Sequence, residues 1–176
     1  MDELTVNWLE FENKEEVFNE IMTTYGTELL QLVYSYVKDQ TVAEELTQDI
    51  FVKVYYSLHT YKKKSKFKTW LWRIAINHCK DHLKSWYNNH VIKVEEIHLE
   101  EDRKENVEME VLQKEENQNI VSAVMDLPIL YREIIFLYYF KELTMKEISS
   151  VLKVNENTIK TRLRRAKELL KQKIGD

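Results

Sequence analysis

Two helix-start signals lie close together near the C-terminal end of the chain, and they restrict the fold more than any other feature. Thr144, followed three residues later by Glu147, is a capping box that opens a short helix. After a break at residues 153–155, Asn155 is a good N-cap for a second, longer helix. Apolar residues then recur at three- and four-residue spacing, so these positions face a core. The inward positions are Ile148, Val151, Leu152, Ile159, Leu163, Ala166 and Leu170.

The outer face of the second helix is basic and rich in hydrogen-bonding groups. It presents Asn157, Lys160, Thr161, Arg164, Arg165 and Lys167. A short helix, a tight turn and a longer helix of this kind describe a helix-turn-helix, whose second helix can enter a DNA major groove. The alternative is an ordinary helical hairpin with a solvated charged face.

Composition favours an all-α fold. The 176 residues include two Gly and one Pro, so few positions break a helix. Apolar residues make up 44% of the sequence, enough for real cores, and no apolar run is long enough for a membrane span. The chain has no signal-peptide pattern, and the single cysteine, Cys79, cannot form an intramolecular disulfide. We therefore expect a cytoplasmic protein without membrane insertion.

Charge is strongly segregated along the chain. The net charge is −4, but residues 61–85 carry eight basic residues and one acidic residue, and residues 141–176 carry ten and five. Residues 1–60 and 86–119 are strongly acidic. Two separate basic blocks suit a protein that grips a polyanion at two places. The acidic blocks are then expected to face a basic protein surface.

Two helices are predicted before the first basic block. Residues 15–38 form a helical apolar stripe, with a kink or break expected at Gly26. A second capping box, Thr41 with Glu44, opens the next helix, which has an apolar face extending to Leu58. Its opposite face is acidic and polar. This face consists of Glu44, Glu45, Gln48 and Asp49; the helix dipole explains the first two well and the last two less well.

The first basic block combines lysines with aromatic residues. A lysine-rich loop at residues 59–68 leads into a helix predicted for residues 69–84. Lysines can hold phosphates while rings and amides receive unstacked bases, so the block suits single-stranded nucleic acid. The alternative is that Trp70 and Trp72 only fill a helical core.

The second half of the chain begins after an acidic segment. We predict a first domain at residues 1–88, an acidic linker at 89–106 and a helix-turn-helix domain at 107–176, in which helical periodicity returns near Val107. Pro128 leads into a segment, residues 131–140, that is too apolar for one buried face. We expect a partner to cover part of it.

Two passages of the sequence resemble the sigma-70-type initiation factors of bacterial RNA polymerase, in the short extracytoplasmic-function (ECF) group. The first passage is residues 43–51 (AEELTQDIF) with 67–77 (FKTWLWRIAIN). The second is residues 127–133 (LPILYRE), 143–148 (LTMKEI) and 157–166 (NTIKTRLRRA). Order and spacing agree from about residue 15 onward.

The resemblance implies two small helical domains, no catalysis, no cofactor and three sets of contact residues. The clamp helices of the largest subunit of core RNA polymerase would bind at Glu44, Glu45, Gln48 and Asp49. The polymerase flap would bind at Ile134, Leu137 and Phe140. The melted minus-ten element of promoter DNA would meet Tyr61, Lys64, Phe67, Trp70, Asn77 and Lys80. The minus-35 duplex would meet Thr158, Lys160, Thr161, Arg162, Arg164, Arg165 and Lys167. An anti-sigma factor is a further partner that the resemblance implies.

The sequence departs from the family pattern in the turn and in the loop. Lys153 stands where a turn glycine is usual, which implies either a left-handed residue, at roughly 1 kcal/mol, or a different turn. Ser149 replaces a common alanine, and residues 62–65 lack the usual Gly-Asp pair.

Two other classes of function explain less of the sequence. His78, Cys79 and His82 form the one candidate metal cluster, but the glutamate of a zinc hydrolase is missing between the histidines and no second cluster converges with them. We therefore expect no metal, with His78 in the core and His82 exposed. A stand-alone helix-turn-helix repressor or activator would explain residues 141–176, but it would leave the acidic face and the first basic block without a role.

Overall fold

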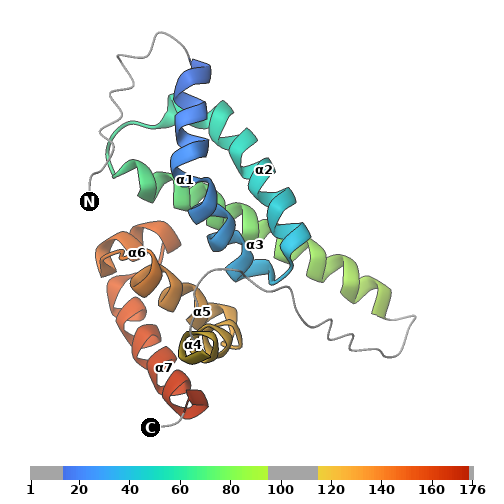
Figure 1. Cartoon of the computed structure of the whole chain (residues 1–176), viewed down its shortest axis with the longest axis vertical. Coiled ribbons are helices and arrows are strands. Elements are labelled where there is room, and N and C mark those ends of the chain that lie inside the picture. Colours follow the sequence, from blue (N-terminus) through green and yellow to red (C-terminus); the bar gives the residue numbers. More distant parts are fainter. Residues whose placement is uncertain (1–13, 95–114, 175–176) are drawn as a thin grey trace.

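The fold is described from a computed structural model, and the description covers residues 14–94 and 115–174. In these two ranges the structure is helical and contains no strand, as the sequence predicts. The first range holds α1 (Lys14–Val37), α2 (Gln40–Ser57), the short 3-10 turn η1 (Leu58–Thr60) and α3 (Phe67–Val94). The second holds α4 (Glu115–Met125), α5 (Ile129–Ile135), the π-helical turn η2 (Phe136–Phe140), α6 (Met145–Leu152) and α7 (Glu156–Ile174). Figure 1 shows the two groups of helices in contact, with α6 beside the first half of α3.

The first domain is a three-helix bundle in which α1, α2 and α3 all touch one another. The buried positions of α1 recur at helical spacing and include Val17, Ile21, Leu29 and Leu32. A break at Gly26, one of the two alternatives predicted there, does not occur, because α1 continues through this residue to Val37. A Cβ atom at Gly26 would meet nothing within 4 Å, so no close packing requires glycine there.

The predicted start of α2 is also wrong in its details. Asp39, not Thr41, caps the helix: its Oδ1 atom accepts a hydrogen bond of 2.9 Å from the backbone N–H of Val42. Glu44 does not close a capping box but accepts a 2.6 Å hydrogen bond from Gln40. The acidic side chain at position 39 satisfies a free N–H group two residues earlier than the sequence pattern suggested.

Helix α3 is longer than predicted. It runs to Val94 and so enters the segment assigned to the linker at 89–106. The rest of that linker lies outside the described residues, as does the helical periodicity expected from Val107 to Leu112. The sequence shows no apolar stripe from residue 87 onward, and for this reason the helix was predicted to end before it. Residues 87–106 nevertheless contain no Gly or Pro to end a helix.

The helix-turn-helix has the predicted form. Thr144 and Glu147 form a reciprocal capping box: the Oγ1 of Thr144 accepts from the N–H of Glu147, and the Glu147 carboxylate accepts from the N–H of Thr144 at 2.8 Å. Asn155 caps α7 by accepting a 2.8 Å hydrogen bond from the N–H of Thr158. Lys153 adopts the left-handed conformation, with φ 55° and ψ 42°, so a lysine takes the backbone shape that glycine adopts without steric cost.

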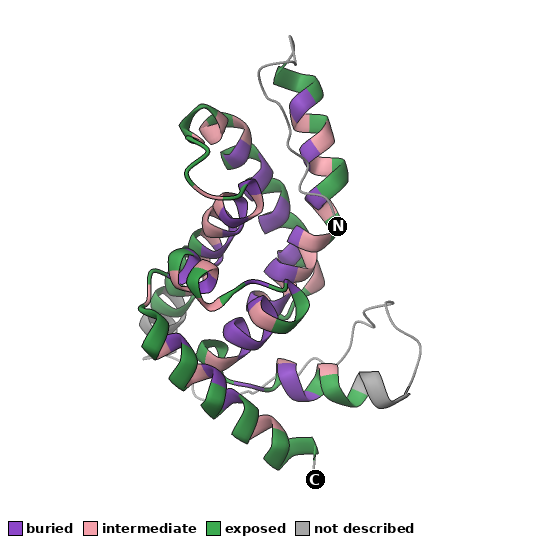
Figure 2. Cartoon of the chain, turned by 90° about the vertical axis from the view of Figure 1, so that its left-hand side faces the viewer, coloured by how far each residue is buried: buried purple, intermediate pink, exposed green. Residues whose placement is uncertain are grey.

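The two domains share one continuous apolar core. Buried residues of α1, α2 and α3 form a single cluster with those of α5, α6 and α7 (Figure 2). In the apolar segment 131–140, Ile134 and Leu137 are fully buried. The sequence predicted that a partner covers part of this segment. In this structure α1 of the same chain covers it instead.

Candidate nucleic-acid and polymerase interfaces

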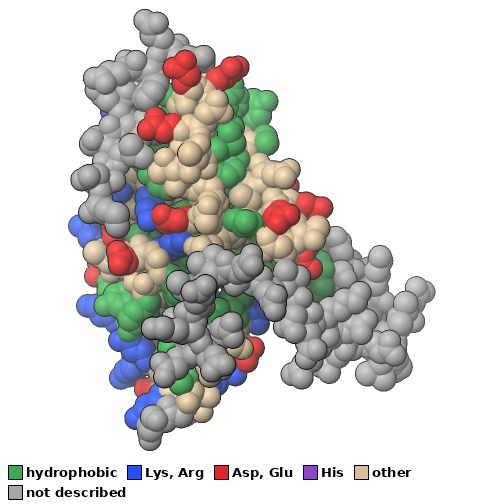
Figure 3. Space-filling view, viewed as in Figure 1, with side chains coloured by type: hydrophobic (Ala, Val, Ile, Leu, Met, Phe, Trp, Pro, Cys, Tyr) green, Lys and Arg blue, Asp and Glu red, His purple; other side chains and the backbone are tan. Residues whose placement is uncertain are grey.

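The outer face of α7 is the clearest candidate surface for duplex DNA. Ile159, Leu163 and Ala166 are buried, which turns the basic positions of the helix outward. Lys160, Thr161, Arg164, Arg165 and Lys167 are exposed, whereas Thr158 and Arg162 are half-buried at the edges of this face. Blue side chains gather over α7 in Figure 3. The arrangement gives one helix a cationic face of the kind that can enter a DNA major groove.

Some α7 side chains already have contacts. Arg165 forms an ion pair of 2.9 Å with Glu168 one turn later, and the Oγ1 of Thr161 donates to the carbonyl of Asn157 at 2.9 Å. The Nζ of Lys167 lies 5.6 Å from the ring centroid of Tyr139, whose hydroxyl raises the pKa of this lysine. The ion pair of Arg165 joins two exposed side chains and therefore costs little to break.

The six residues predicted to meet single-stranded DNA do not form one exposed surface. Lys64 and Asn77 are exposed, and Tyr61 and Trp70 are half-buried. Phe67 is only 7% exposed and packs against the rings of Tyr61 and Trp70, at centroid distances of 5.3 and 5.4 Å. The Nζ of Lys80 is paired with Glu133 of the second domain at 2.9 Å. Phe67 is therefore the buried member of the aromatic cluster, and the ammonium group of Lys80 already has Glu133 as its partner.

The two tryptophans of α3 have different roles. Trp72 is fully buried, so the alternative prediction of a core-filling role is confirmed for this residue. Trp70 is half-buried at the end of the aromatic cluster. The exposed amide of Asn77 lies two turns further along α3 and can both donate to and accept from a base edge.

The acidic face of α2 is intact and faces outward. Glu44, Glu45, Gln48 and Asp49 are all exposed, while Leu46 and Ile50 on the other side of the helix are buried. Asp49 is 67% exposed, and its Oδ2 lies 3.9 Å from the Nε2 of His78. None of these carboxylates supports the core, so the helix can offer them to a basic partner.

The expected flap contacts are only partly accessible. Ile134 and Leu137 have no exposed area, whereas Phe140 is 45% exposed and stacks on Phe136 at 5.4 Å. The exposed apolar side chains near Phe140 in sequence are Ile129, Leu130 and Tyr139. A partner that approached this structure would reach Phe140 and Tyr139 before the two buried residues.

The candidate metal cluster does not form. Over residues 14–94 and 115–174, no three His, Cys, Asp or Glu side chains are placed to hold a metal ion. His78 and His82 are both half-buried, not one buried and one exposed as predicted. Burial lowers the pKa of His78 and raises that of the Cys79 thiol to about 12, so this cysteine is a core residue with little thiolate character.

A set of charged residues between the domains was not predicted from the sequence. Glu28 of α1 is paired with Lys68 at 2.9 Å and with Lys141 at 3.6 Å. Glu133, almost fully buried, accepts a 2.7 Å hydrogen bond from the hydroxyl of Tyr36. We call Glu28, Tyr36, Glu133 and Lys141 the interdomain network. Partners about a hundred positions apart in the chain leave no local sequence signal.

The pKa values in this network reflect burial and opposite charge. Burial lowers the pKa of Lys141, and Glu28 opposes this effect. Burial alone would raise the pKa of Glu28, but Lys68 and Lys141 outweigh it and lower that pKa. Burial, together with the negative charge of Glu133, raises the pKa of Tyr36 well above its ordinary value.

Comparison with known proteins identifies the family. Residues 21–86 match the model of sigma-70 region 2, and residues 117–170 match sigma-70 region 4. The chain is 30% identical over 158 residues to the ECF RNA polymerase sigma factor SigM of Bacillus subtilis, covering 87% of this chain and 92% of SigM. The chain belongs to the ECF sigma factors.

Other relatives agree with this assignment. The ECF sigma factor SigW of Bacillus subtilis is 28% identical over 170 residues, with 92% of this chain and 91% of SigW covered. The fold is similar to the sigma factor RpoE of Bartonella quintana, solved with the anti-sigma factor NepR, at a TM-score of 0.72, 20% identity and coverage of 89% and 96% of the two chains. CnrH, solved with the cytosolic domain of CnrY, gives a TM-score of 0.63 at 20% identity, covering 92% and 88%.

As a sigma factor, the protein is a partner of core RNA polymerase and promoter DNA, and its family is not a family of enzymes. In the described residues no helix combines the length and the apolar character needed to cross a bilayer.

Proposed function

We propose that this sigma factor reads a promoter with two separate surfaces, while the acidic face of α2 binds the clamp helices of the largest polymerase subunit. The observation that carries the proposal is the exposed acidic face of Glu44, Glu45, Gln48 and Asp49 in a protein with two basic blocks. Polymerase association brings both basic surfaces to the same DNA. The protein then acts in the cytoplasm, where chromosome and polymerase are accessible, and it has no catalytic role of its own.

The minus-35 element is read as duplex by α7. Lys160, Thr161, Arg164 and Arg165 are exposed along the helix and would face base edges. Thr158, Arg162 and Lys167 lie toward the sides of this face, which suits phosphate contacts that set the register. Base-edge contacts from Arg or Thr then set the sequence preference.

The minus-ten element is held as a separated strand by the start of α3 and the loop before it. Asn77 would bond the edge of a flipped base, and Tyr61 and Trp70 offer ring surface beside it. Lys64 and Lys80 would neutralise phosphates. The buried ring of Phe67 packs against the rings of Tyr61 and Trp70. Burial of Phe67 suggests that its contribution is to hold Tyr61 and Trp70 in place and not to stack on a base.

The remaining partners concern the second domain and its surroundings. The polymerase flap would contact Phe140 first, and would reach Ile134 and Leu137 only if the two domains separate. Residues 1–88 and 107–176 would act as the two functional domains, with 89–106 as the acidic connection. An anti-sigma factor is a further proposed partner, because the similar fold of the Bartonella quintana sigma factor RpoE has been solved with such a protein.

Reconstituted transcription tests the proposal directly. With core RNA polymerase and a library of promoter fragments, the protein is expected to direct initiation at a restricted set of sites that share two elements. Core polymerase alone is the control. A stand-alone repressor would bind duplex DNA without polymerase and would direct no starts, and that result would replace the sigma-factor mechanism.

Asn77→Ala is expected to impair promoter opening more than closed-complex formation. The side chain is exposed and supports no core contact, so the loss concerns only the hydrogen bonds to an unpaired base, roughly 1–3 kcal/mol. Permanganate reactivity of unpaired thymines measures opening, and a mobility assay at low temperature measures the closed complex. His82→Ala, on the same helix, is the control. Normal permanganate reactivity in Asn77→Ala would remove this residue from the melting surface.

A further inference from the structure

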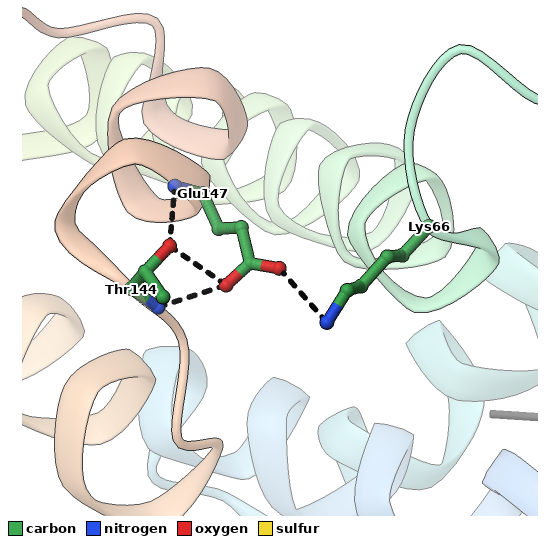
Figure 4. A network of polar contacts seen from close by, with 3 residues as sticks. All are labelled: Lys66, Thr144 and Glu147. Atoms are coloured by element: carbon green, nitrogen blue, oxygen red, sulfur yellow. Dashed lines mark hydrogen bonds and ion pairs between the residues drawn. The ribbon is translucent and has the colours of Figure 1, made fainter. Parts of the chain in front are cut away.

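The two ends of α6 differ in how their charges are satisfied. At its start, Glu147 accepts hydrogen bonds from the backbone N–H and the hydroxyl of Thr144, and it pairs with Lys66, which directly precedes α3, at 3.5 Å (Figure 4). Just after its end, Lys153 is exposed and forms no ion pair or side-chain hydrogen bond with any other described residue. The chain therefore pairs the charges at the start of α6 and presents an unpaired lysine after its end.

The turn after α6 does not need the lysine side chain. The N–H groups of Lys153 and Val154 both donate to the carbonyl of Ser149, and Val154 packs against the core. These backbone bonds and this apolar contact close the turn. Glycine adopts the left-handed shape of Lys153 without steric cost, whereas a residue with a Cβ atom does so unfavourably. A strained residue that the fold does not require points to a role outside the fold.

Lys153 lies next to the end of α7 that we propose to insert into DNA. It precedes Glu156, the first residue of α7, by three positions, so their Cα atoms are at most about 11 Å apart. A recognition helix inserts its N-terminal residues into a major groove about 12 Å wide. The residue that leads into such a helix is therefore close to one of the two phosphate backbones that border the groove.

The cations further along α7 differ from Lys153 in having partners. Arg165 is paired with Glu168 at 2.9 Å, and the Nζ of Lys167 lies 5.6 Å from the ring centroid of Tyr139. These side chains must exchange a contact within the protein for a contact with DNA. Lys153 has no such contact to give up, so its ammonium group can take a phosphate as a charge-assisted hydrogen-bond partner.

We propose that Lys153 binds a phosphate of the duplex that α7 reads, and that this contact fixes the register of α7 in the groove. The proposal rests on the proposed function, because it takes duplex DNA as the ligand of α7. A phosphate contact positions the protein without selecting a base. The competing role for Lys153 is to offset the partial negative charge at the C-terminal end of α6, which would act on stability and not on DNA binding.

Lys153→Gly separates these two roles in the complete protein bound to core RNA polymerase. The probe is a fluorescein-labelled duplex promoter fragment from a site at which reconstituted transcription starts. We expect the affinity to fall roughly three- to tenfold, and the slope of log affinity against log salt concentration to become shallower by about 0.9. The loss should be equal on fragments with single base changes in the minus-35 element, because a phosphate contact is not specific for a base. The urea midpoint of the free chain should not fall, because glycine removes the strain.

Lys38→Gly is the matched control. Lys38 is also an exposed lysine, with φ 60°, in the turn between α1 and α2, so this substitution changes charge and backbone strain in the same way outside the helix-turn-helix. At saturating core polymerase it should leave the salt slope unchanged. Lys153→Arg keeps the charge and should retain both affinity and slope. Lys153→Asn, which also tolerates the left-handed shape, replaces the glycine variant if that variant does not fold.

Three results would overturn the proposal. An unchanged salt slope in the folded, uncharged variant would mean that Lys153 meets no phosphate. A lower urea midpoint with an unchanged slope would assign the lysine to the end of α6. An equal loss of slope in Lys38→Gly would mean that the effect comes from net charge and not from a contact at this turn.

Transcription with the unaltered chain distinguishes this inference from the proposed function. If the chain directs site-selective starts while Lys153→Gly keeps the full salt slope, the phosphate contact is wrong and the sigma-factor mechanism stands. If the chain directs no starts but binds duplex DNA by itself, the slopes are measured with the chain alone on duplex DNA of mixed sequence. A slope that is shallower by about 0.9 in Lys153→Gly would then support the contact while the sigma-factor mechanism is wrong.

Discussion

Asp49→Lys is expected to abolish association with core RNA polymerase and to leave the fold intact. The side chain is 67% exposed at the C-terminal end of the acidic face, whereas the next residue of α2, Ile50, is fully buried. Reversing a charge at a complementary interface replaces attraction by repulsion, which costs about 2–5 kcal/mol when the pair is desolvated. We therefore expect at least about a thirtyfold loss of affinity, since 1.4 kcal/mol is tenfold.

The substitution should be tolerated by the protein itself. Asp49 contributes no hydrogen bond to the core, and its nearest ionic neighbour among the described residues is His78 at 3.9 Å. Burial already lowers the pKa of His78, so this imidazole is mostly neutral near pH 7 and a new lysine meets little repulsion. Thermal unfolding is expected to stay within the small range of surface substitutions.

Asp81→Lys is the matched control for this experiment. Asp81 is also exposed, also acts electrostatically on His78, and lies on α3 outside the acidic face of α2. Capture of core polymerase by the immobilised protein measures the association, with the control retaining full capture. Undiminished capture by Asp49→Lys would remove α2 from the polymerase interface.

Local signals in the sequence predicted local structure well. The capping box of Thr144 and Glu147 and the cap at Asn155 join residues three positions apart, so the pattern contains both partners of each bond. At Lys153 the sequence left two alternatives open, a left-handed residue or a different turn, and the structure has the left-handed residue. The error at Asp39 is of the same local kind: Asp39 and Thr41, two positions apart, could both cap α2, and spacing alone did not choose between them.

Long-range contacts could not be predicted in the same way. The apolar content of residues 131–140 correctly indicated a second covering surface, but no pattern identified that surface as α1. Glu28 and Lys141, or Tyr36 and Glu133, are ordinary residues on their own helices and become a network only when the domains meet. The predicted contact residues of α2 and α7 are largely exposed because periodicity determines which side of a helix is outward. The predicted contact residues Phe67, Ile134 and Leu137 are buried, because tertiary packing covers them and the periodicity of a single helix does not reveal such packing.

Trp72→Ala is expected to lower the free energy of unfolding by about 3–5 kcal/mol. Trp72 has no exposed area and meets the edge of Tyr25 at a centroid distance of 6.4 Å. Lys68 and Lys141 both place their ammonium groups 5.8 Å from its ring centroid. Because a domain has only about 5–15 kcal/mol of stability in total, this loss is large, and urea unfolding monitored by circular dichroism measures it.

Two comparisons identify the source of that loss. Trp86→Ala, on the same helix but 52% exposed, should change stability by less than about 1 kcal/mol. Trp72→Phe should lose less than Trp72→Ala, because the buried Nε1 of Trp72 has no hydrogen-bond partner among the described residues and phenylalanine keeps the ring. A loss in Trp72→Ala no larger than in Trp86→Ala would mean that this ring does not anchor the core.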